Sequence, residues 1–241
     1  MHGIIEADGL TRTFGDVTAV DHVTLTIPRG ELFGLLGPNG SGKTTMNKLM
    51  TGQIHPTSGT IRVMDMDVAE RPLDVRAKVG IIPEQETPPS FLTAEEYLHF
   101  VGKIRGLTDI EERANSWFNI LEFRDKKEVL CKDLSRGTRQ KLMVAQAFLH
   151  EPPLAFIDEP LINLDPIMQR TVKDFLQEYV FNGGTIFFST HILGIAEEIC
   201  TSFAILSGGS VLHHGTIDQL RADNRKLEGF FLEQVKGPAY A

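Results

Sequence analysis

The feature that most limits the fold of this chain is a glycine-rich octapeptide, GPNGSGKT, at residues 37–44. It matches the phosphate-binding pattern G-x-x-x-x-G-K-[ST], in which successive backbone N–H groups curl around phosphate oxygens. Gly37, Gly40 and Gly42 permit backbone angles and close approaches that a Cβ would prevent. The pattern needs a strand before it and a helix after it, and it predicts that the chain binds a nucleoside triphosphate.

The flanking residues supply this strand–loop–helix order. The apolar run LFGLL at residues 32–36 is typical of a buried parallel strand. Residues 44–51 predict a helix that ends at Gly52. The phosphates would therefore meet a helix N-terminus, where unpaired N–H groups and the positive end of the helix dipole favour anions. An ordinary glycine-rich turn is the alternative, and the flanking elements disfavour it.

Side chains of the loop have specific expected roles. Lys43 would lie against the terminal phosphates as a point charge, and the Thr44 hydroxyl would complete a Mg²⁺ coordination shell. The other nucleotide contacts expected from this segment are the three glycines, Pro38, Asn39, Ser41 and Thr45.

A second group of candidate residues follows another apolar run. Residues 154–157, LAFI, predict a buried strand that ends in Asp158 and Glu159. Ligands collect at the carboxyl ends of strands in an open parallel sheet. We expect Asp158 to join the magnesium shell and Glu159 to polarise the attacking water. Taken alone, the segment would favour a strand followed by an ordinary acidic turn, but the phosphate-binding loop favours the functional interpretation.

Composition excludes several classes of protein. A chain of 241 residues is near the upper size for one hydrophobic core, so one domain with two lobes and two domains are both open. Cys131 and Cys200 lie far apart without a C-x-x-C pattern, which disfavours disulfides and zinc and favours a reducing, cytosolic compartment. The net charge of −8 disfavours bulk attraction to nucleic acid or anionic lipid. We expect no membrane span and no signal peptide.

The order of expected elements indicates an α/β fold. Val23, Leu25 and Ile27 alternate with polar residues, as in a half-buried strand of an antiparallel lobe. From residue 93 to 150 the pattern is helical, with possible capping boxes at Thr93 and Thr108. Strands return at 154–157, 185–189, 203–206 and 211–212. A helix over 166–182 separates the first two of these strands, and a short helical tail is expected near residues 230–232.

Four segments, in this order, resemble the nucleotide-binding subunits of ABC transporters. They are GPNGSGKT at 37–44, LSRGT at 134–138, the strand end DEP at 158–160, and STH at 189–191. The second segment distinguishes this family from other nucleoside triphosphatases. It corresponds to the signature, usually LSGGQ, that only ABC-type ATPases place between the other motifs. The likeness covers nearly the whole chain and is greatest to the export-type, drug- or ion-extruding subfamily.

The resemblance implies one ABC ATPase domain: a P-loop NTPase core of mixed sheet and helices, an antiparallel β lobe and an inserted helical subdomain. The core lobe would take residues 1–86 and 152–222, the helical subdomain 87–151, and a tail 223–241. The implied ligands are ATP and Mg²⁺. The implied partner is a separate integral-membrane permease, which would hold this protein on the cytoplasmic face of the cell membrane. Its docking segment would lie near residues 87–92 and include Phe91.

Further site residues follow from the resemblance. Phe14 would stack on adenine with Val20 packed nearby, although Phe14 also suits a core or strand-end aromatic. His191 corresponds to the switch histidine that reaches the γ-phosphate. Ser135 and Gly137 would contact ATP held by the opposite subunit of a head-to-tail dimer, in which the second subunit is a copy or a paralogue.

The loop that communicates across that dimer contains Asp165, which also suits the N-cap of the helix beginning at Pro166. The sequence departs from the family pattern at Arg136, Thr138 and Asn163, which replace Gly, Gln and Gly. The family's glutamine loop, which reaches the metal and water, falls on Glu84 or Gln85, and we assign Gln85 to the metal.

Two other functional classes fit the motifs less well. A soluble ABC-type ATPase acting on nucleic acid or ribosomes usually has a coiled-coil insertion or two fused ATPase halves, and this chain has neither. A nucleotide-binding regulator without turnover is disfavoured by the presence of Lys43, Asp158, Glu159 and His191.

Overall fold

The computed structural model describes residues 3–84, 88–159, 161 and 164–236. Within these residues the strands form two sheets, one of order β2-β1-β4-β5 and one of order β10-β9-β3-β8-β7-β6. The strands are β1 (Ile5–Phe14), β2 (Val17–Ile27), β3 (Leu32–Leu36), β4 (Ser58–Val63), β5 (Met66–Asp67), β6 (Gly80–Ile82), β7 (Leu154–Asp158), β8 (Thr185–Thr190), β9 (Ser202–Ser207) and β10 (Ser210–Thr216).

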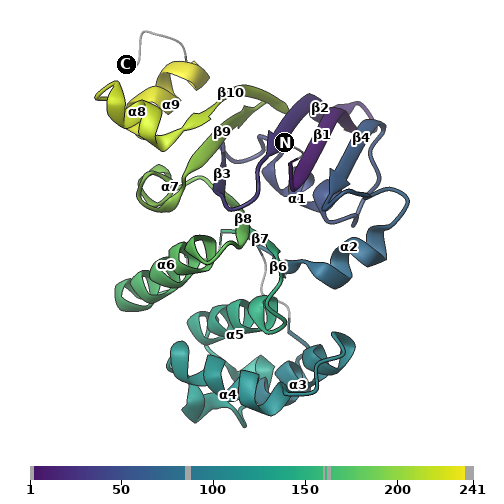
Figure 1. The fold of residues 1–241 in the computed structure, drawn as a ribbon, viewed down its shortest axis with the longest axis vertical. Helices are drawn as coiled ribbons and strands as arrows, with labels where there is room; N and C mark the ends of the chain where they lie inside the picture. The colour runs from purple at the N-terminus through teal and green to yellow at the C-terminus, as the bar shows by residue number, and fades with distance from the viewer. Residues whose placement is uncertain (1–2, 85–87, 160, 162–163, 237–241) are drawn as a thin grey trace.

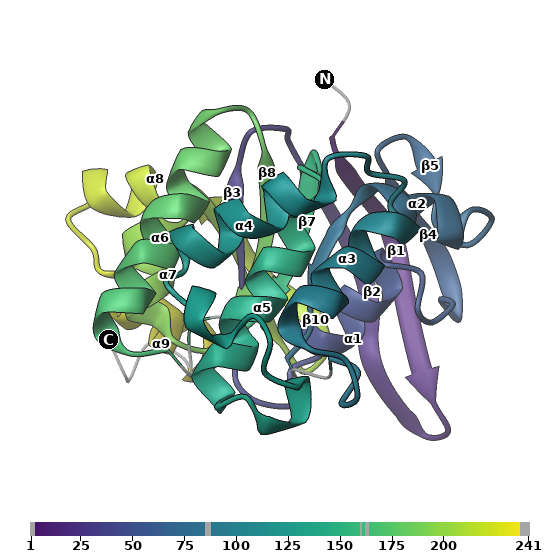
Figure 2. The same ribbon diagram turned by 90° about the horizontal axis from the view of Figure 1, so that it is seen from below.

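The helices fall into distinct groups around these sheets. They are α1 (Lys43–Met50), α2 (Pro72–Lys78), α3 (Ala94–Ile104), α4 (Ile110–Ile120), α5 (Arg136–Phe148), α6 (Pro166–Phe181), α7 (Leu193–Ile199), α8 (Ile217–Ala222) and α9 (Leu227–Lys236), with 3₁₀ turns at Arg124–Lys126 and Cys131–Asp133. Figure 1 shows α3, α4 and α5 together at the end of the molecule farthest from β1, β2 and β4. Figure 2 places the antiparallel strands on the side opposite α8 and α9. In the described part of the chain, no helix combines the length and apolarity needed to cross a bilayer.

The antiparallel sheet has the alternation expected from its sequence. Val23, Leu25 and Ile27 of β2 are buried, and the threonines between them are exposed. Strand β1 pairs antiparallel with both β2 and β4, so that Ile5 lies opposite Ile27 on one side and Val63 on the other. The inward-facing residues of these strands form one apolar cluster with α1 and one face of the larger sheet.

The larger sheet positions the candidate site. Strand β3 lies between β8 and β9, and β7 lies between β8 and β6, with all of these pairs parallel. Every residue of β3, β7 and β8 is buried, as expected for strands covered on both faces. Because the carboxyl ends of parallel strands meet at one edge, the segments after these three strands converge there.

The two faces of this sheet contribute to different cores. On β8, Ile186 and Phe188 belong to a cluster with the helices α3 to α7, whereas Phe187 belongs to the cluster with the antiparallel lobe. Phe187 stacks against Phe33 of β3 with ring centroids 5.6 Å apart. The sheet is therefore the shared wall between the antiparallel lobe and the helical side of the molecule.

The helical insertion between β6 and β7 begins with a well-defined cap. Thr93 accepts a hydrogen bond from the Glu96 backbone N–H, and the Glu96 carboxylate accepts one from Thr93, so the predicted capping box is confirmed. The second predicted box, at Thr108, is wrong. Helix α4 begins after Asp109, whose carboxylate accepts a hydrogen bond from Arg113 instead of from a backbone N–H of the first turn.

Candidate nucleotide-binding site

A cavity of about 350 Å³ opens at the carboxyl edge of the parallel strands. Its lining comes from five separate segments of the sequence: Ala19 on β2, the loop after β3 with the start of α1, Glu84, the end of β7 and the segment after β8. The lining residues are Ala19, Asn39, Gly40, Gly42, Lys43, Thr44, Thr45, Glu84, Asp158, Glu159 and His191. The fold thus brings together residues that the sequence motifs placed more than a hundred positions apart.

The loop before α1 is shaped by its glycines. Gly40 and Gly42 have φ values of 77° and 110°, in the left-handed region that disfavours other residues. A Cβ on Gly37 would come within 2.3 Å of the Leu206 carbonyl oxygen, so that position also excludes a larger residue. Helix α1 starts directly after Gly42, which has no side chain to cap the first turn. The N–H groups at this end of α1 therefore suit an anion.

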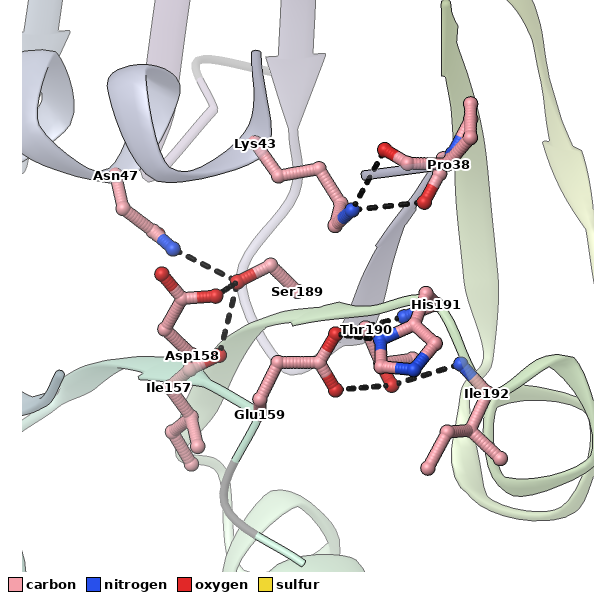
Figure 3. A network of polar contacts seen from close by, with 11 residues as sticks. Pro38, Lys43, Asn47, Ile157, Asp158, Glu159, Ser189, Thr190, His191 and Ile192 are labelled. Carbon is pink, nitrogen blue, oxygen red and sulfur yellow. Dashed lines mark hydrogen bonds and ion pairs between the residues drawn. The ribbon is translucent and has the colours of Figure 1, made fainter. Parts of the chain in front are cut away.

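Lys43 supplies the positive charge in this cavity. Its ammonium donates hydrogen bonds to the carbonyl oxygens of Gly37, at 2.7 Å, and Pro38, at 3.1 Å (Figure 3). Burial lowers the pKa of Lys43, while the nearby carboxylates of Glu159, Asp158 and Glu84 act in the opposite direction. A triphosphate would give this buried ammonium a stronger acceptor than the two carbonyl oxygens that it now contacts.

Asp158 is buried at the end of β7, directly beside Ser189 on β8. The Ser189 hydroxyl donates to Asp158 Oδ1 at 2.7 Å. Burial raises the pKa of Asp158, and the neighbouring polar side chains of Ser189, Asn47 and Thr44 oppose this rise. A carboxylate held out of water in this way gains from a nearby cation.

Glu159 is held by the segment that follows β8. One carboxylate oxygen, Oε1, accepts from the His191 backbone N–H at 2.8 Å and lies 2.6 Å from His191 Nδ1. The other, Oε2, accepts from the Thr190 hydroxyl at 2.8 Å (Figure 3). Glu159 has a φ of 50°, unusual for a residue with a side chain. Such backbone strain is typical of functional sites.

Other predicted site residues lie outside the cavity. Ser135 is the N-cap of α5, where its hydroxyl accepts from the Thr138 N–H, and Gly137 lies in the first turn of that helix. Neither residue, although both are described, lines the cavity. Asp165 caps α6 by accepting from the N–H groups of Ile167 and Met168, as predicted. The Asp165 carboxylate lies on the surface at the start of α6.

The remaining predictions concern Phe14, Val20 and the glutamine loop. Phe14 ends β1, with 45% of its surface exposed and the Arg12 guanidinium over its ring. Val20 is fully buried in the core of the antiparallel lobe. Glu84 lines the cavity, whereas Gln85 lies outside the described residues.

Sequence reasoning missed two polar residues next to Asp158. Asn47 on α1 and Ser189 on β8 are both buried, and the Asn47 amide donates to the Ser189 hydroxyl at 2.7 Å. Asn47 stands among the inward-facing apolar residues Met46, Leu49 and Met50 of α1. A polar residue on the buried stripe of a helix was the available indication.

The fold and this site define a P-loop nucleoside triphosphatase of the α/β class. A family model described as "ABC transporter" matches residues 20–162. The chain is 35% identical to the bacitracin transport ATP-binding protein BcrA of Enterococcus faecalis, over 98% of this chain and 77% of that protein. It is 31% identical to the Nod factor export ATP-binding protein I of Cupriavidus pinatubonensis, over 97% of this chain and 74% of the relative.

A solved structure titled "Structure of ATP binding subunit of ABC transporter" superimposes with a TM-score of 0.89 at 32% identity, covering 95% of this chain and 98% of that one. The chain belongs to the ABC transporter family. It is an ATP-binding subunit and an ATPase, and the predicted recognition and fold class are confirmed.

Proposed function

We propose that this subunit hydrolyses ATP with Mg²⁺ in the cavity after β3 and thereby energises export through a separate integral-membrane permease. The convergence of Lys43, Thr44, Asp158, Glu159 and His191 on one cavity carries the proposal. The names of two relatives, a bacitracin transport protein and a Nod factor export protein, support transport and favour the outward direction. An ATPase acting on nucleic acid or ribosomes is not favoured, because these relatives are transport proteins.

The triphosphate would occupy the loop between β3 and α1. Backbone N–H groups of this loop and of the first turn of α1 would bind the phosphate oxygens, with Lys43 against the terminal phosphates. The adenine would stack on Phe14, whose half-exposed ring lies at the end of β1. The remaining proposed contacts are Val20, Gly37, Pro38, Asn39, Gly40, Ser41, Gly42, Thr44 and Thr45.

The donor set fits a magnesium ion carried by the nucleotide. Thr44, Asp158 and Glu84 place oxygen atoms around one cavity, and oxygen donors are what Mg²⁺ prefers. Of the two glutamine-loop candidates, we propose Glu84 here, because Gln85 lies outside the described residues. The described residues contain no group of three or more acidic, His or Cys side chains that would hold a metal by themselves. Mg²⁺ typically binds through one or two carboxylates plus phosphates, which agrees with this sparse set. When bound, the ion would neutralise charge on the phosphates.

Glu159 would orient and polarise the attacking water. Its Oε1 accepts from His191, whereas Oε2 accepts from Thr190 and keeps a second lone pair, since each carboxylate oxygen has two. Oε2 is therefore the atom that we assign to the water. His191, with 45% of its side chain exposed, can bridge from Glu159 towards the γ-phosphate.

The site would be completed by a second subunit. Ser135 and Gly137, which the resemblance assigns to ATP, lie at the start of α5 and not in the cavity of their own chain. A head-to-tail pair with two-fold symmetry would place α5 of each subunit against the nucleotide of the other. Asp165, at the start of α6, would lie along the same interface. In each subunit the core lobe (1–86, 152–222), helical subdomain (87–151) and tail (223–241) would form one domain.

The permease would dock on an exposed apolar surface beside α3. Phe91, Phe100 and Ile104 are 77%, 49% and 67% exposed, and Leu73 on α2 is 73% exposed. The Arg105 guanidinium donates to the carbonyl oxygens of Arg76 and Ala77, which ties the end of α3 to the end of α2. These two elements therefore present one surface, and we assign it to a short helix of the permease.

Reconstitution of the chain with its membrane permease in proteoliposomes tests the proposal. We expect MgATP-dependent movement of cargo with the unmodified chain and none with Lys43→Ala, because that variant lacks the charge that holds the terminal phosphates. The exposed Lys48, five positions further along α1, offers a matched control as Lys48→Ala. Failure of the unmodified chain to bind ATP with Mg²⁺, even beside the permease, would refute the proposed function.

A further inference from the structure

A chain of buried polar side chains links α1 to Asp158. The Asn47 amide donates to Ser189 Oγ at 2.7 Å, and Ser189 Oγ donates to Asp158 Oδ1 at 2.7 Å. The three side chains come from α1, β8 and β7 and point towards one another in Figure 3. Asn47 is 8% exposed, Ser189 0% and Asp158 5%, so solvent competes little for these hydrogen bonds.

The direction of the two hydrogen bonds is fixed by their chemistry. A serine hydroxyl has one hydrogen, and Ser189 Oγ lies 2.7 Å from the Asp158 carboxylate and 3.3 Å from the Ile157 carbonyl oxygen. The shorter contact to the charged acceptor takes the hydrogen. An amide N–H of Asn47 can only donate, so it fills a lone pair of Ser189 and favours the hydroxyl orientation that points at Asp158. Such linked hydrogen bonds strengthen one another.

Packing alone does not explain an asparagine at position 47. The inward-facing neighbours on α1 are apolar, and asparagine is a weak helix former in a helix interior. Its Oδ1 is buried and has no hydrogen-bond partner among the described residues. An apolar side chain would avoid this unfavourable burial. The amide is therefore retained at a cost to folding, which points to a role at the site.

Asn47 also lies outside the cavity that holds the phosphate-binding loop. It lines a second cavity of about 330 Å³ behind α1, which shares Thr44, Glu84 and Asp158 with the first. Those three shared residues are the oxygen donors that we assign to magnesium. Asn47 thus approaches the metal ligands from the side opposite the nucleotide.

We propose that Asn47 is a positioning residue for the magnesium site, which acts through Ser189 to fix the carboxylate of Asp158. This inference rests on the proposed function. Ser189 holds Oδ1 of Asp158 at 2.7 Å, and we assign the other carboxylate oxygen, Oδ2, to the coordination shell of the ion. Partners that orient a metal-binding carboxylate affect metal affinity although they do not touch the metal.

The test separates magnesium-dependent from magnesium-independent nucleotide binding. Binding of a fluorescent ATP analogue is measured in EDTA and across a Mg²⁺ titration, for the unmodified chain, Asn47→Leu, Ser189→Ala and the double variant. We expect the half-saturating Mg²⁺ concentration to rise about 10- to 100-fold in each single variant. Affinity in EDTA should stay within about twofold, because the phosphate-binding loop is unchanged. Asn119→Leu, at an exposed asparagine of α4 that lines neither cavity, serves as the control and should match the unmodified chain.

The double variant tests the route through Ser189. If Asn47 acts through Ser189, the double variant should need no more Mg²⁺ than the worse single variant, because coupled residues are not additive. Multiplying effects would overturn the proposal, and so would a Mg²⁺ requirement of Asn47→Leu within about twofold of normal. An equal loss of affinity in EDTA would also overturn it, by indicating general damage.

Two checks keep the result decisive. Asn47→Ala only truncates the side chain, so it replaces Asn47→Leu if that variant does not fold, with the same expected rise in Mg²⁺ requirement. An unmodified chain that failed to bind ATP in any condition would refute the proposed function. An unmodified chain that binds ATP with Mg²⁺, beside an Asn47 variant that behaves identically, would refute only the inference about Asn47.

Discussion

Contacts with neighbouring residues hold the backbone and the carboxylate of Glu159 in one position. Its backbone is strained, its N–H donates to the Ser189 carbonyl oxygen, and its carboxylate accepts from Thr190 and His191. These contacts leave little freedom for the side chain to rotate. A carboxylate that is fixed before the substrate arrives needs no reorganisation during the reaction, which is how positioned groups lower barriers.

Glu159→Gln should bind ATP but hydrolyse it about 10²- to 10⁴-fold more slowly, since an amide cannot accept a proton from water. The variant should also accumulate as an ATP-bound dimer, because hydrolysis would normally open it. Phosphate release and size-exclusion chromatography with ATP measure the two effects. Glu112→Gln, on the exposed face of α4, is the matched control. Turnover at the parental rate would exclude Glu159 as the group that polarises water.

His150 lies two residues after the end of α5, and we expect it to affect the stability of the fold. Burial, with a smaller effect of the Arg105 charge, lowers its pKa to about 4. Unfolded histidine has a pKa near ~6.5, so between these values the unfolded state binds more protons than the folded state. The contribution of His150 to stability is therefore complete above about pH 6.5 and falls as the pH drops towards 4.

His150→Gln should remove this part of the acid sensitivity, because glutamine does not titrate. The melting temperature of the variant should change less between pH 6.5 and 4 than that of the unmodified chain. Differential scanning fluorimetry over this range provides the measurement, and His55→Gln, on an exposed residue, provides the comparison. Identical slopes for both variants and the parent would show that His150 does not contribute.

Secondary-structure elements differ in how well the sequence predicts them. Strands β3, β7 and β8 follow from apolar runs, and α5 and α6 follow from their caps at Ser135 and Asp165, because these determinants are local. The Thr108 cap failed because α4 begins one residue later, with Asp109 at its N-cap, and the Asp109 carboxylate pairs with Arg113. Asn47 gained its partner from β8, 142 residues away, which no local pattern contains.

The junction of α2 and α3 depends on one guanidinium. Arg105 donates to the carbonyl oxygens of Arg76, Ala77 and Val79, at 2.6, 2.7 and 3.2 Å, and so caps the C-terminus of α2. Arg105→Met should lower the free energy of unfolding by about 1 to 2 kcal/mol, because charged hydrogen bonds to partly exposed carbonyl oxygens are lost. Urea denaturation measures this. Lys103→Met, exposed on α3, should cost much less, and equal losses would contradict the capping role.

The apolar surface beside α3 should matter for transport and not for basal hydrolysis. Phe91→Asp places a charge where we expect the permease helix, at a residue that does not line the cavity after β3. We expect weaker co-purification with the permease and reduced transport, with basal ATPase activity unchanged. Phe181→Asp, on a side chain that is 90% exposed at the end of α6, controls for a charge placed elsewhere. Normal transport by Phe91→Asp would remove this docking assignment.

The order of the motifs in the sequence was enough to predict that most of their residues meet at one site, but it did not show how two subunits pair. The parallel sheet brings the ends of β3, β7 and β8 to one cavity because topology requires it. Ser135 and Gly137 remain outside this cavity, at the start of α5. The resemblance assigns Ser135 and Gly137 to ATP, but within one subunit these residues do not line the nucleotide cavity. We propose that a second subunit brings these residues to the nucleotide.

A mixing experiment tests whether Ser135 acts on the opposite subunit. Lys43→Ala removes the phosphate-binding charge and Ser135→Arg blocks the start of α5, so each variant alone should lose nearly all ATPase activity. In a head-to-tail heterodimer both defects fall in one site and the other site is intact. An equimolar mixture should therefore recover about a quarter of the parental activity, since about half of the dimers are mixed and each has one intact site. A mixture of Lys43→Ala and Glu159→Gln should recover no activity. Both residues act on the nucleotide bound by their own chain, so each of the two sites in a mixed dimer carries one defect. If Ser135 instead served its own chain, both mixtures would stay inactive while mixed dimers still formed.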